Sequence, residues 1–522
     1  MSEMSEPKAG RREWIGLGVI ALPCVLYSMD LTVLNLALPR ISAELSPTSS
    51  ELLWIIDIYG FLVAGLLITM GNLGDRIGRR KLLLIGAVAF GLASLLAAFS
   101  TTASMLIAAR AVLGVAGATL APSTLSLIRN MFLDPEERSL AIGVWISSYT
   151  VGGALGPVLG GFMLHHFWWG SVFLLAVPVM LLLLALGPVL LPEYKDDSAR
   201  PLDLTSALLS LVAVLSVIYG MKHIAEQGVG VLSLGAIAVG VLVAVLFGRR
   251  QRRLADPLID LRLFKVPAFS TSLATFTLGT LVAFGVYIFV GQYLQLVLGL
   301  SPLEAGLWML PSSLGFIVGS MLAPAIGRRL GAPLVMGIGL ALAAAGFALL
   351  TQVERLGLPG LVIAVLMYSL ALAPVFTLGT DLIVGSAPPE RAGAAAAMSE
   401  TASELGGALG IATLGSIGTA IYRAALADAN LAGVSAEVRE VARDTLGAAA
   451  AAAAHLPEPI GAALLSTARE AFTHAMIVTV GLCALLAAVA AVISFLLLGG
   501  KKPAPEGASD QDSAVRLGSS QH

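Results

Sequence analysis

Six charged residues lie inside long apolar stretches of this sequence: Asp30, Asp57, Arg110, Asp381, Glu400 and Glu404. A charge within a membrane-spanning helix costs about 2.5–3.5 kcal/mol on insertion scales, so such a residue normally faces a cavity or pairs with another group. Five of the six are acids, and a cavity of that sign attracts cations. A proton and a cation compete for a buried carboxylate, because each compensates the same charge. We therefore expect these acids to bind cations, protons or both.

Glu400 and Glu404 are the pair with the most specific spacing. They are four residues apart, so on a helix they share one face. Counting about 1.5 Å per residue from Arg391 places Glu400 about 13 Å into the membrane, near its middle. Two carboxylates on one face resist ionising together. We predict that at least one of them binds a proton or a cation; the alternative is a hydrogen-bond anchor between helices.

The elements that must position these residues are membrane-spanning helices. The chain of 522 residues is 57% hydrophobic and 12% charged, whereas a soluble protein is nearer one quarter charged. Stretches of about 20 apolar residues span the hydrocarbon core as helices. The sequence therefore predicts an all-α polytopic membrane protein with spans at about 14–36, 51–70, 82–99, 104–127, 139–164, 169–190, 205–221, 231–248, 269–297, 305–325, 334–350, 359–386, 392–420 and 471–498.

The loops orient these fourteen spans. With the N-terminus inside, the inside loops and tails hold 23 of the 31 basic residues, whereas the short outside loops hold Arg40, Lys222 and Arg355. This asymmetry satisfies the positive-inside rule, so both termini are predicted to be cytoplasmic. The 421–470 gap is a long outside loop, and its alanine run Gly447–His455 favours a short helical excursion. Its role is either structural, as a lid or spacer, or in substrate access.

Composition also defines the units of the chain and excludes several classes of partner. We expect a cytoplasmic tail (1–13), a six-helix bundle (14–190), a linker with two extra spans (191–266), a second bundle (267–498) and a cytoplasmic tail (499–522). The first apolar stretch contains Asp30 and lacks a clear cleavage site, so it is interpreted as a retained span. The net charge of −2 argues against nucleic acid, and no metal-ligand spacing occurs, so we expect no metal and no cofactor.

The remaining charges leave alternatives open. Asp30 lies in the outer half of its span and either binds a proton or cation or makes a structural hydrogen bond. Asp57 is either an interfacial residue or a gate for proton entry. Asp381 is either a deep site or an inner-gate charge. Arg110 is expected to pair with an acid and tune its proton affinity, unless the pair is structural.

Aromatic side chains complete a site for organic cations, because a ring face attracts a positive charge. The candidates are Trp54, Tyr59, Trp145, Tyr149, Phe284, Tyr287 and Phe376. For each of them, packing or anchoring at the membrane interface is the alternative.

A glycine-rich, basic motif lies between the second and third spans: Gly71-Asn72-Leu73-Gly74-Asp75-Arg76-Ile77-Gly78-Arg79-Arg80-Lys81. Its glycines permit a tight turn, and Asp75 is placed to accept from Arg79 and to lie near a helix N-terminus. The motif closely resembles the cytoplasmic signature of the major facilitator superfamily. The resemblance implies that Gly71, Asp75, Arg76, Gly78, Arg79 and Arg80 form a latch that stabilises the outward-facing state.

Further motifs continue the resemblance over residues 14–498. The segment 30–39 resembles the first-span motif of fourteen-span drug:proton antiporters, and Arg110 with Gly114 and Gly117 resembles their fourth-span motif. The segment 152–161 resembles their fifth-span motif, which implies a moving hinge or seal formed by Gly152, Gly156, Pro157, Gly160 and Gly161. The segment 324–331 is a decayed copy of the signature that lacks an aspartate, which supports two halves related by a pseudo-two-fold axis.

The resemblance implies a proton-driven exporter of small lipophilic cations, such as quaternary ammonium compounds, dyes and biguanide-like antiseptics. The expected protein is a monomer embedded in the lipid bilayer of a bacterial plasma membrane, works by alternating access and needs no cofactor. An exporter of an endogenous metabolite, siderophore or lipid on the same fold is the alternative. A membrane enzyme is disfavoured, because no GxSxG, HExxH or nucleotide-binding loop occurs.

Overall fold

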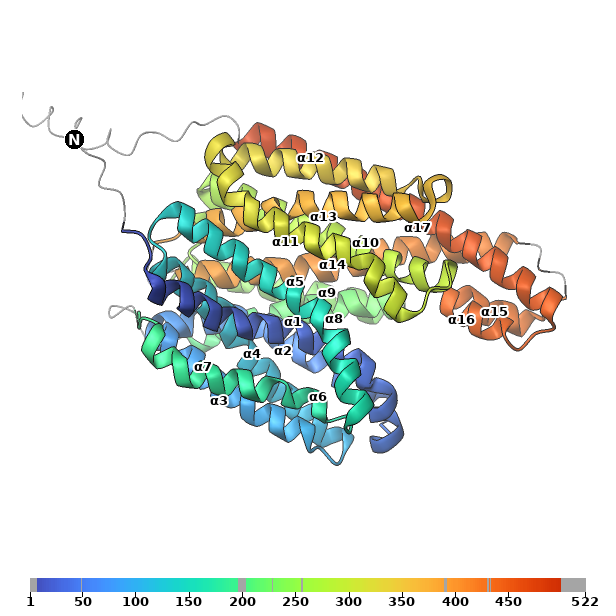
Figure 1. The fold of residues 1–522 in the computed structure, drawn as a ribbon, viewed down its shortest axis with the longest axis horizontal. Coiled ribbons are helices and arrows are strands. Elements are labelled where there is room, and N and C mark those ends of the chain that lie inside the picture. Colours follow the sequence, from blue (N-terminus) through green and yellow to red (C-terminus); the bar gives the residue numbers. More distant parts are fainter. Residues whose placement is uncertain are drawn as a thin grey trace, which may run out of the picture.

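The protein is built from long helices that lie roughly parallel to one another (Figure 1). The computed structural model describes residues 7–47, 49–195, 203–227, 229–254, 257–388, 392–429, 431 and 433–498. Within these residues, fourteen helical segments are long and apolar enough to cross a membrane, which confirms the predicted number of spans. Regular structure in this part of the chain is helical throughout, because a helix satisfies its backbone hydrogen bonds internally, as hydrocarbon requires.

The helices fall into two bundles and a central pair. The first bundle comprises α1 (Arg11–Leu45), α2 (Ser49–Ile77), α3 (Arg79–Ala98), α4 (Ala103–Met131), α5 (Pro135–His166), α6 (Ser171–Leu174) and α7 (Ala176–Leu190), of which α6 and α7 form one span. The central pair is α8 (Leu204–Gln227) and α9 (Val231–Gln251). The second bundle comprises α10 (Pro267–Gln292), α11 (Pro302–Leu330), α12 (Ala332–Leu350), α13 (Val353–Gly385), α14 (Ala392–Asp428) and α17 (Glu458–Leu498).

Each bundle has its own hydrophobic core. One core joins buried side chains of α1–α7, and another joins those of α10–α14 and α17. A third, smaller cluster brings Ile68 of α2 together with Leu258 and Leu263 of the linker and Ile383 of α13. The two bundles are therefore packed units that meet through shared residues at one end. The residue limits of the predicted units remain a prediction.

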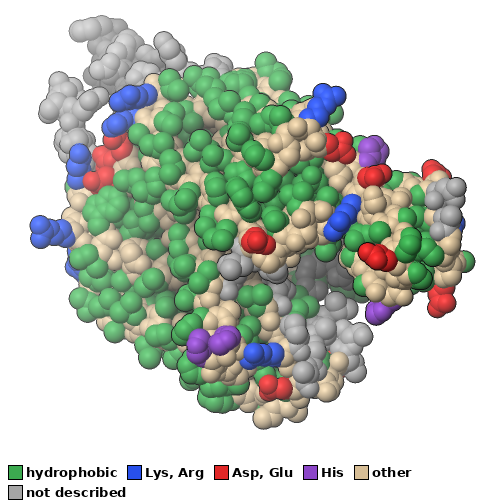
Figure 2. Space-filling view, turned by 45° about the vertical axis from the view of Figure 1, so that its right-hand side comes forward, with side chains coloured by type: hydrophobic (Ala, Val, Ile, Leu, Met, Phe, Trp, Pro, Cys, Tyr) green, Lys and Arg blue, Asp and Glu red, His purple; other side chains and the backbone are tan. Residues whose placement is uncertain are grey.

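The surface matches a lipid environment. Figure 2 shows hydrophobic side chains over much of the left and upper part of the view, where charged side chains lie mainly at the rim, while further charged side chains lie in the middle and on the right. The outward side of α9 is the most exposed apolar surface, with Val231 92% accessible and Leu242 60%. An apolar surface of this extent is stable in hydrocarbon and not in water.

Several helices are longer than their predicted spans. α14 continues to Asp428 and α17 begins at Glu458, so both extend past the apolar stretches. Between them, α15 (Ala436–Asp444) and α16 (Leu446–Ala453) form the predicted helical excursion, with Thr445 capping α16 by accepting from the amide of Ala448. Alanine favours helix wherever packing permits, which explains why hydropathy alone ended the thirteenth span too early and began the fourteenth span too late.

The predicted break before the twelfth span is also present. α13 is two helical pieces joined at Gly357, which has φ 61° and ψ −156°. A residue with a side chain rarely adopts this conformation, so glycine permits the helix to restart in a new direction.

The glycines of the fifth-span motif let α1 and α5 approach closely. A Cβ added to Gly152 would lie 2.2 Å from the carbonyl oxygen of Val25, and one added to Gly156 would lie 1.9 Å from Oγ1 of Thr32. At Gly160 the added atom would meet Val33 at 2.9 Å, whereas Gly161 has open space around it. Three of the predicted motif glycines thus have a packing reason and Gly161 has none. The side chain of Pro157 lies outside the described residues.

This difference predicts opposite outcomes for two matched substitutions. Gly152→Ala forces α5 away from α1, and overpacking of this kind costs about 1–3 kcal/mol. Gly161→Ala adds a methyl group to open space and is expected to be neutral. Thermal unfolding of the purified variants in one detergent measures the difference. Equal unfolding temperatures for the two variants would contradict the packing role of Gly152.

Candidate functional site

A hydrogen bond between the two bundles defines the centre of the candidate site. The hydroxyl of Tyr27 on α1 donates to Oε1 of Glu404 on α14 at 2.9 Å. The two residues are 377 positions apart in sequence, and both side chains are partly buried. Tyr27 thus links one of the predicted acids directly to the opposite bundle.

Tyr27 packs with two further aromatic rings, and a third ring packs with one of these. The ring centroid of Tyr27 is 5.9 Å from that of Tyr59 and 5.8 Å from that of Tyr149, and Tyr149 lies 5.0 Å from Trp145. Trp145 is held in place by its Nε1, which donates to Oγ1 of Thr124 at 2.9 Å. These four rings, here called the aromatic cluster, come from α1, α2 and α5 of the first bundle.

Glu400 lies one helical turn from Glu404 and faces the same cluster. It is within electrostatic reach of Cys24, Tyr27 and Tyr149. Among the described residues, its half-buried carboxylate has no hydrogen bond or ion pair. A carboxylate beside aromatic rings attracts an organic cation in two ways, through its negative charge and through cation–π contact with the rings.

Asp30 is connected to the aromatic cluster through Arg110. Nη1 of Arg110 donates to Oδ2 of Asp30 at 2.6 Å, and its Nε donates to the carbonyl of Ile55 at 3.0 Å. The guanidinium carbon of Arg110 also lies 4.8 Å from the ring centroid of Tyr59. Arg110 is fully buried, and this set of partners compensates its charge.

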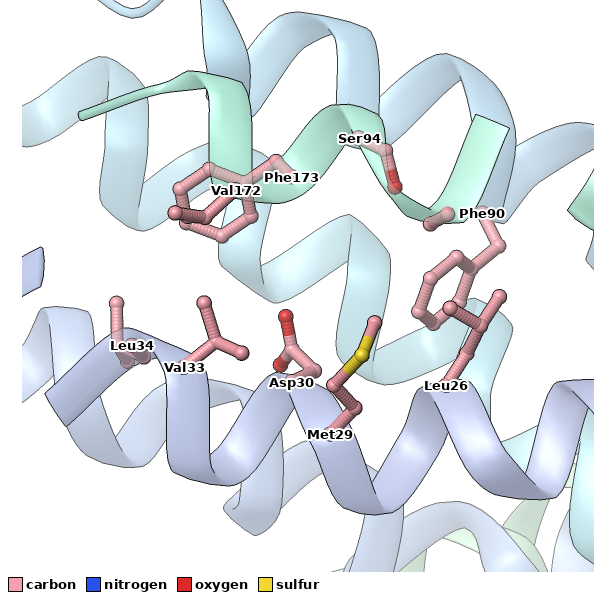
Figure 3. Close-up of a pocket in the computed structure, with 10 residues that line it drawn as sticks. Leu26, Met29, Asp30, Val33, Leu34, Phe90, Ser94, Val172 and Phe173 are labelled. Atoms are coloured by element: carbon pink, nitrogen blue, oxygen red, sulfur yellow. The ribbon is translucent and has the colours of Figure 1, made fainter. Parts of the chain in front are cut away.

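Asp30 faces the interior of the first bundle. Figure 3 shows its carboxylate among Phe90, Ser94 and Phe173, which line a cavity of about 20 Å³. A cavity of this size beside polar groups holds about one water molecule. Asp30 and the glutamate pair therefore lie in different surroundings, joined by Arg110, Tyr59 and Tyr27.

The other predicted aromatic residues have other neighbours. Trp54 packs on Phe61. Phe284 is 49% exposed and lies beside Gly407, three residues after Glu404 on α14, and Tyr287 is 60% exposed. Phe376 contacts Phe276 and Phe316 and packs against all three hydrophobic clusters, between the bundles. The side chain of Asp57 lies outside the described residues.

Tyr27 is the residue that sequence reasoning missed. A signal was present, because Tyr27 precedes Asp30 by three positions and therefore lies one helical turn away on the same side of α1.

The signature motif closes one end of the molecule. Nε of Arg79 donates to Oδ1 of Asp75 at 2.8 Å, as the spacing predicts. The same carboxylate lies beside the backbone amides of Gly393 and Ala394, at the start of α14 in the other bundle. A negative charge at a helix N-terminus is favourable, so Asp75 fastens the two bundles together. Close approach depends on Gly71, where an added Cβ would lie 2.5 Å from the carbonyl oxygen of Gly393.

The basic residues of the signature hold the turn in place. Gly78 has φ 107°, a conformation that favours glycine. Arg79 is buried against the ring of Tyr194 at 4.9 Å. Arg80 pairs with Glu193 at 3.5 Å, and Arg76 lies half-buried in the last turn of α2.

Three arginine contacts reinforce the same end. Nε of Arg138 on α5 donates to Oδ1 of Asp381 on α13 at 2.9 Å. Arg129 of α4 donates to the carbonyls of Val384 and Ala387 at 2.5 and 2.7 Å. Arg328 of α11 pairs with Glu136 at the start of α5. These links lie at the end that the loop charges predict to be cytoplasmic, and in Figure 1 the bundles diverge toward the opposite end.

These contacts bear on two open questions. For Asp381, the ion pair with Arg138 favours an inner-gate charge over a deep site. The decayed signature keeps Arg328 and lacks an aspartate, and Glu136 of the opposite bundle supplies the acid. Both halves therefore use arginines and acids to close this end. In the first half the motif itself contains the acid, Asp75, whereas in the second half Arg328 pairs with an acid of the other bundle.

A hydrogen-bond chain ties the central pair to the signature motif. Nδ2 of Asn72 donates to the carbonyl of Leu258 at 2.9 Å, and the amide of Leu258 donates to Oε1 of Gln251 at 2.7 Å. Nε2 of Gln251 donates to Oγ of Ser206 at 2.8 Å. Gln251 is 3% exposed, so each of these groups needs its partner.

The series of hydrogen bonds ends at an ion pair that joins the start of α8 to the end of α9. Nη2 of Arg250 lies 2.8 Å from Oδ2 of Asp203. Burial acts to raise the pKa of Asp203, but hydrogen bonds from Ser206 and Arg250 outweigh it and hold the pKa below its ordinary value. The carboxylate therefore stays charged, and the ion pair fixes the base of the hairpin.

Two helical bundles that enclose buried acids and close at one end define a polytopic transporter. A family model described as Major Facilitator Superfamily matches residues 20–411. The chain belongs to this superfamily. It is a multi-pass protein of the cell membrane, and it transports solutes and is not an enzyme.

Two similar proteins are named as a multidrug efflux pump and a resistance protein. The chain is 43% identical over 490 residues to the multidrug efflux pump LfrA of Mycolicibacterium smegmatis, covering 94% of this chain and 97% of that protein. It is 39% identical to the methyl viologen resistance protein SmvA of Salmonella typhimurium, covering 88% and 93%. The human organic anion transporter MFSD10 has a TM-score of 0.59 at 16% identity, covering 91% of this chain and 99% of that chain, and shares the fold.

The ion pair at the closed end predicts a rescue experiment. Arg138→Asp or Asp381→Arg alone is expected to favour opening of this end by tenfold or more, because a hydrogen bond to a charged group contributes about 1.5–3 kcal/mol. The double exchange restores the pair and the closed state. Spin labels at Lys81→Cys and Arg329→Cys, both exposed, report the distance across this end. No rescue by the double exchange would contradict a gate role.

Gln251 gives a second prediction. Gln251→Leu leaves the buried amide of Leu258 and the hydroxyl of Ser206 without this partner, at a cost of about 1–3 kcal/mol. We expect faster amide exchange at Leu258 and a larger open population in the same spin-label measurement. The exposed Gln352→Leu serves as the control. Unchanged amide exchange at Leu258 in Gln251→Leu would show that these hydrogen bonds do not hold the linker in place.

Proposed function

We propose that this chain exchanges lipophilic cations for protons across the cell membrane by alternating access. That it is a multidrug efflux pump follows from its similarity to LfrA and SmvA over nearly their whole length. The name of SmvA refers to methyl viologen, a flat dication, which suits a site of acids and ring faces. Both bundles of one chain contribute to the site, so the proposal needs only a monomer.

The observation that carries the proposal is the contact between Tyr27 and Glu404. It places a carboxylate of the second bundle on Tyr27, which packs with the other rings of the aromatic cluster in the first bundle. A flat cation that enters between them replaces the tyrosine hydroxyl as the partner of Glu404 and stacks on the rings. Glu400, which has no partner among the described residues, provides the second negative charge.

Exchange follows from competition for these carboxylates. A proton on Glu400 or Glu404 removes the charge that attracts the cation, so protonation releases the drug and binding of the drug releases the proton. Asp30 is the second proton site in this proposal. When Asp30 takes up a proton, Arg110 loses its carboxylate partner, and Tyr59 carries that change to the aromatic cluster.

The closed end provides one of the two required states. With Asp75, Arg129 and Arg138 fastening the bundles, we assign the structure to the outward-facing side of the cycle. The glycine contacts between α1 and α5 then keep the first bundle rigid while it rocks against the second, with the boundaries near residues 190 and 267 as predicted.

An efflux assay tests this proposal. In cells loaded with ethidium or methyl viologen, Glu400→Gln, Glu404→Gln and Asp30→Asn are expected to reduce proton-driven efflux at least tenfold, because each removes a titratable charge. Tyr27→Phe keeps the ring, removes the hydroxyl and is expected to weaken export less. Efflux is measured against the amount of protein in the membrane.

The controls separate coupling from folding. Glu354→Gln, on an exposed carboxylate, is expected to leave efflux unchanged. A proton ionophore is expected to stop efflux by the unmodified protein. Continued efflux after the gradient collapses would remove proton exchange from the proposal, and full activity of both glutamine variants would remove the glutamate site.

A further inference from the structure

A second cavity lies at the base of the central pair, far from the aromatic cluster in sequence and structure. It occupies the segment between α9 and α10, has a volume of about 640 Å³ and opens to the surface. Its lining includes Gln251, Arg252, Asp260, Arg262 and Lys265. None of these residues takes part in the proposed exchange of cations and protons.

The charge of this cavity is strongly positive. Residues 249–265 hold six basic and two acidic side chains. Arg262 is compensated by Asp260, with Nη2 and Oδ2 3.0 Å apart. Arg252 and Lys265 are exposed and have no hydrogen bond or ion pair through their side chains among the described residues. Within the described part of the chain, the lining therefore carries two positive charges without a protein partner, which suits a phosphate group.

The surroundings of the cavity are those of a lipid. Above it, α9 presents Val245 and Leu246, which are 46% and 45% exposed, along the membrane-facing side of the helix. Beside it, Phe264 and Val266 are 44% and 40% exposed. The loop charges place this segment at the cytoplasmic interface, where anionic headgroups lie and attract basic residues. A phosphate bound here would thus have apolar surface for attached acyl chains within reach.

From this geometry, we infer that Arg252 and Lys265 bind the headgroup of an anionic phospholipid in the cavity between α9 and α10, with its acyl chains along α9. The lipid lies against the residues that hold the linker, since Gln251 both lines the cavity and accepts the amide of Leu258. A bound headgroup therefore stabilises the linker that is tied to Asn72 of the signature motif.

Lipid titration of the purified full-length protein tests this inference. Dioleoylphosphatidylglycerol is added to the protein in a neutral detergent, and thermal unfolding and native mass spectrometry report binding. We expect phosphatidylglycerol to raise the unfolding temperature and dioleoylphosphatidylcholine to have little effect. In Arg252→Gln/Lys265→Gln the affinity is expected to fall tenfold or more, because each basic residue near the surface contributes about one kcal/mol.

A matched control and a free anion complete the experiment. Lys8→Gln/Arg11→Gln removes the same two charges from exposed positions on the same predicted side and is expected to bind phosphatidylglycerol like the unmodified protein. Glycerol 3-phosphate alone is expected to leave the unfolding temperature unchanged. Equal lipid affinity in the two double variants would show that Arg252 and Lys265 do not form the lipid site. If glycerol 3-phosphate raised the unfolding temperature as much as phosphatidylglycerol does, the cavity would be a site for a free anion and not for a lipid.

Discussion

The cost of an uncompensated charge in hydrocarbon governs the arrangement of this protein. Arg110 is completely enclosed, and its side chain is oriented by Asp30, by backbone carbonyls of α2 and by the ring of Tyr59. Those partners come from α1 and α2, whereas Arg110 is on α4. Removing any partner leaves a buried cation exposed to a low dielectric, which costs several kcal/mol. The rotation of three helices in the first bundle is thus fixed by one guanidinium group.

The same constraint shapes the contact between bundles. At the closed end, each charge finds its partner across the interface: Asp75 on the backbone of α14, Arg138 on Asp381, and Arg328 on Glu136. The contacts of Asp75 and of Arg138 with Asp381 are largely buried, whereas Arg328 and Glu136 are both more than half exposed and contribute less. All three join groups of opposite bundles, so opening this end breaks them. Charged contacts of this kind favour an end of the molecule that is either fully closed or fully open. In a partly open interface, the charges would have neither a protein partner nor water.

The central pair of helices is part of this interface. α8 packs on α2 and on α14, one helix from each bundle, and Gly65 of α2 would clash with Leu211 and Leu215 if it carried a side chain. The linker that follows α9 is bonded to Asn72 and packs with Ile68 and Ile383. The connector thus contacts both bundles beside the signature motif.

The sequence by itself determined the number of membrane spans, the signature motif and the shared face of Glu400 and Glu404, and its loop charges predict the orientation of the spans. These features are local, because hydropathy, charge and helical spacing act over one helix at a time. Tertiary structure decided which groups meet. Tyr27 reaches Glu404 across 377 residues, Asp30 turns into the first bundle, and Phe284 of α10 lies beside Gly407 of α14. Helical periodicity gives the face of each helix but not its rotation against a distant neighbour, and that rotation is set by packing and by the pairing of buried charges.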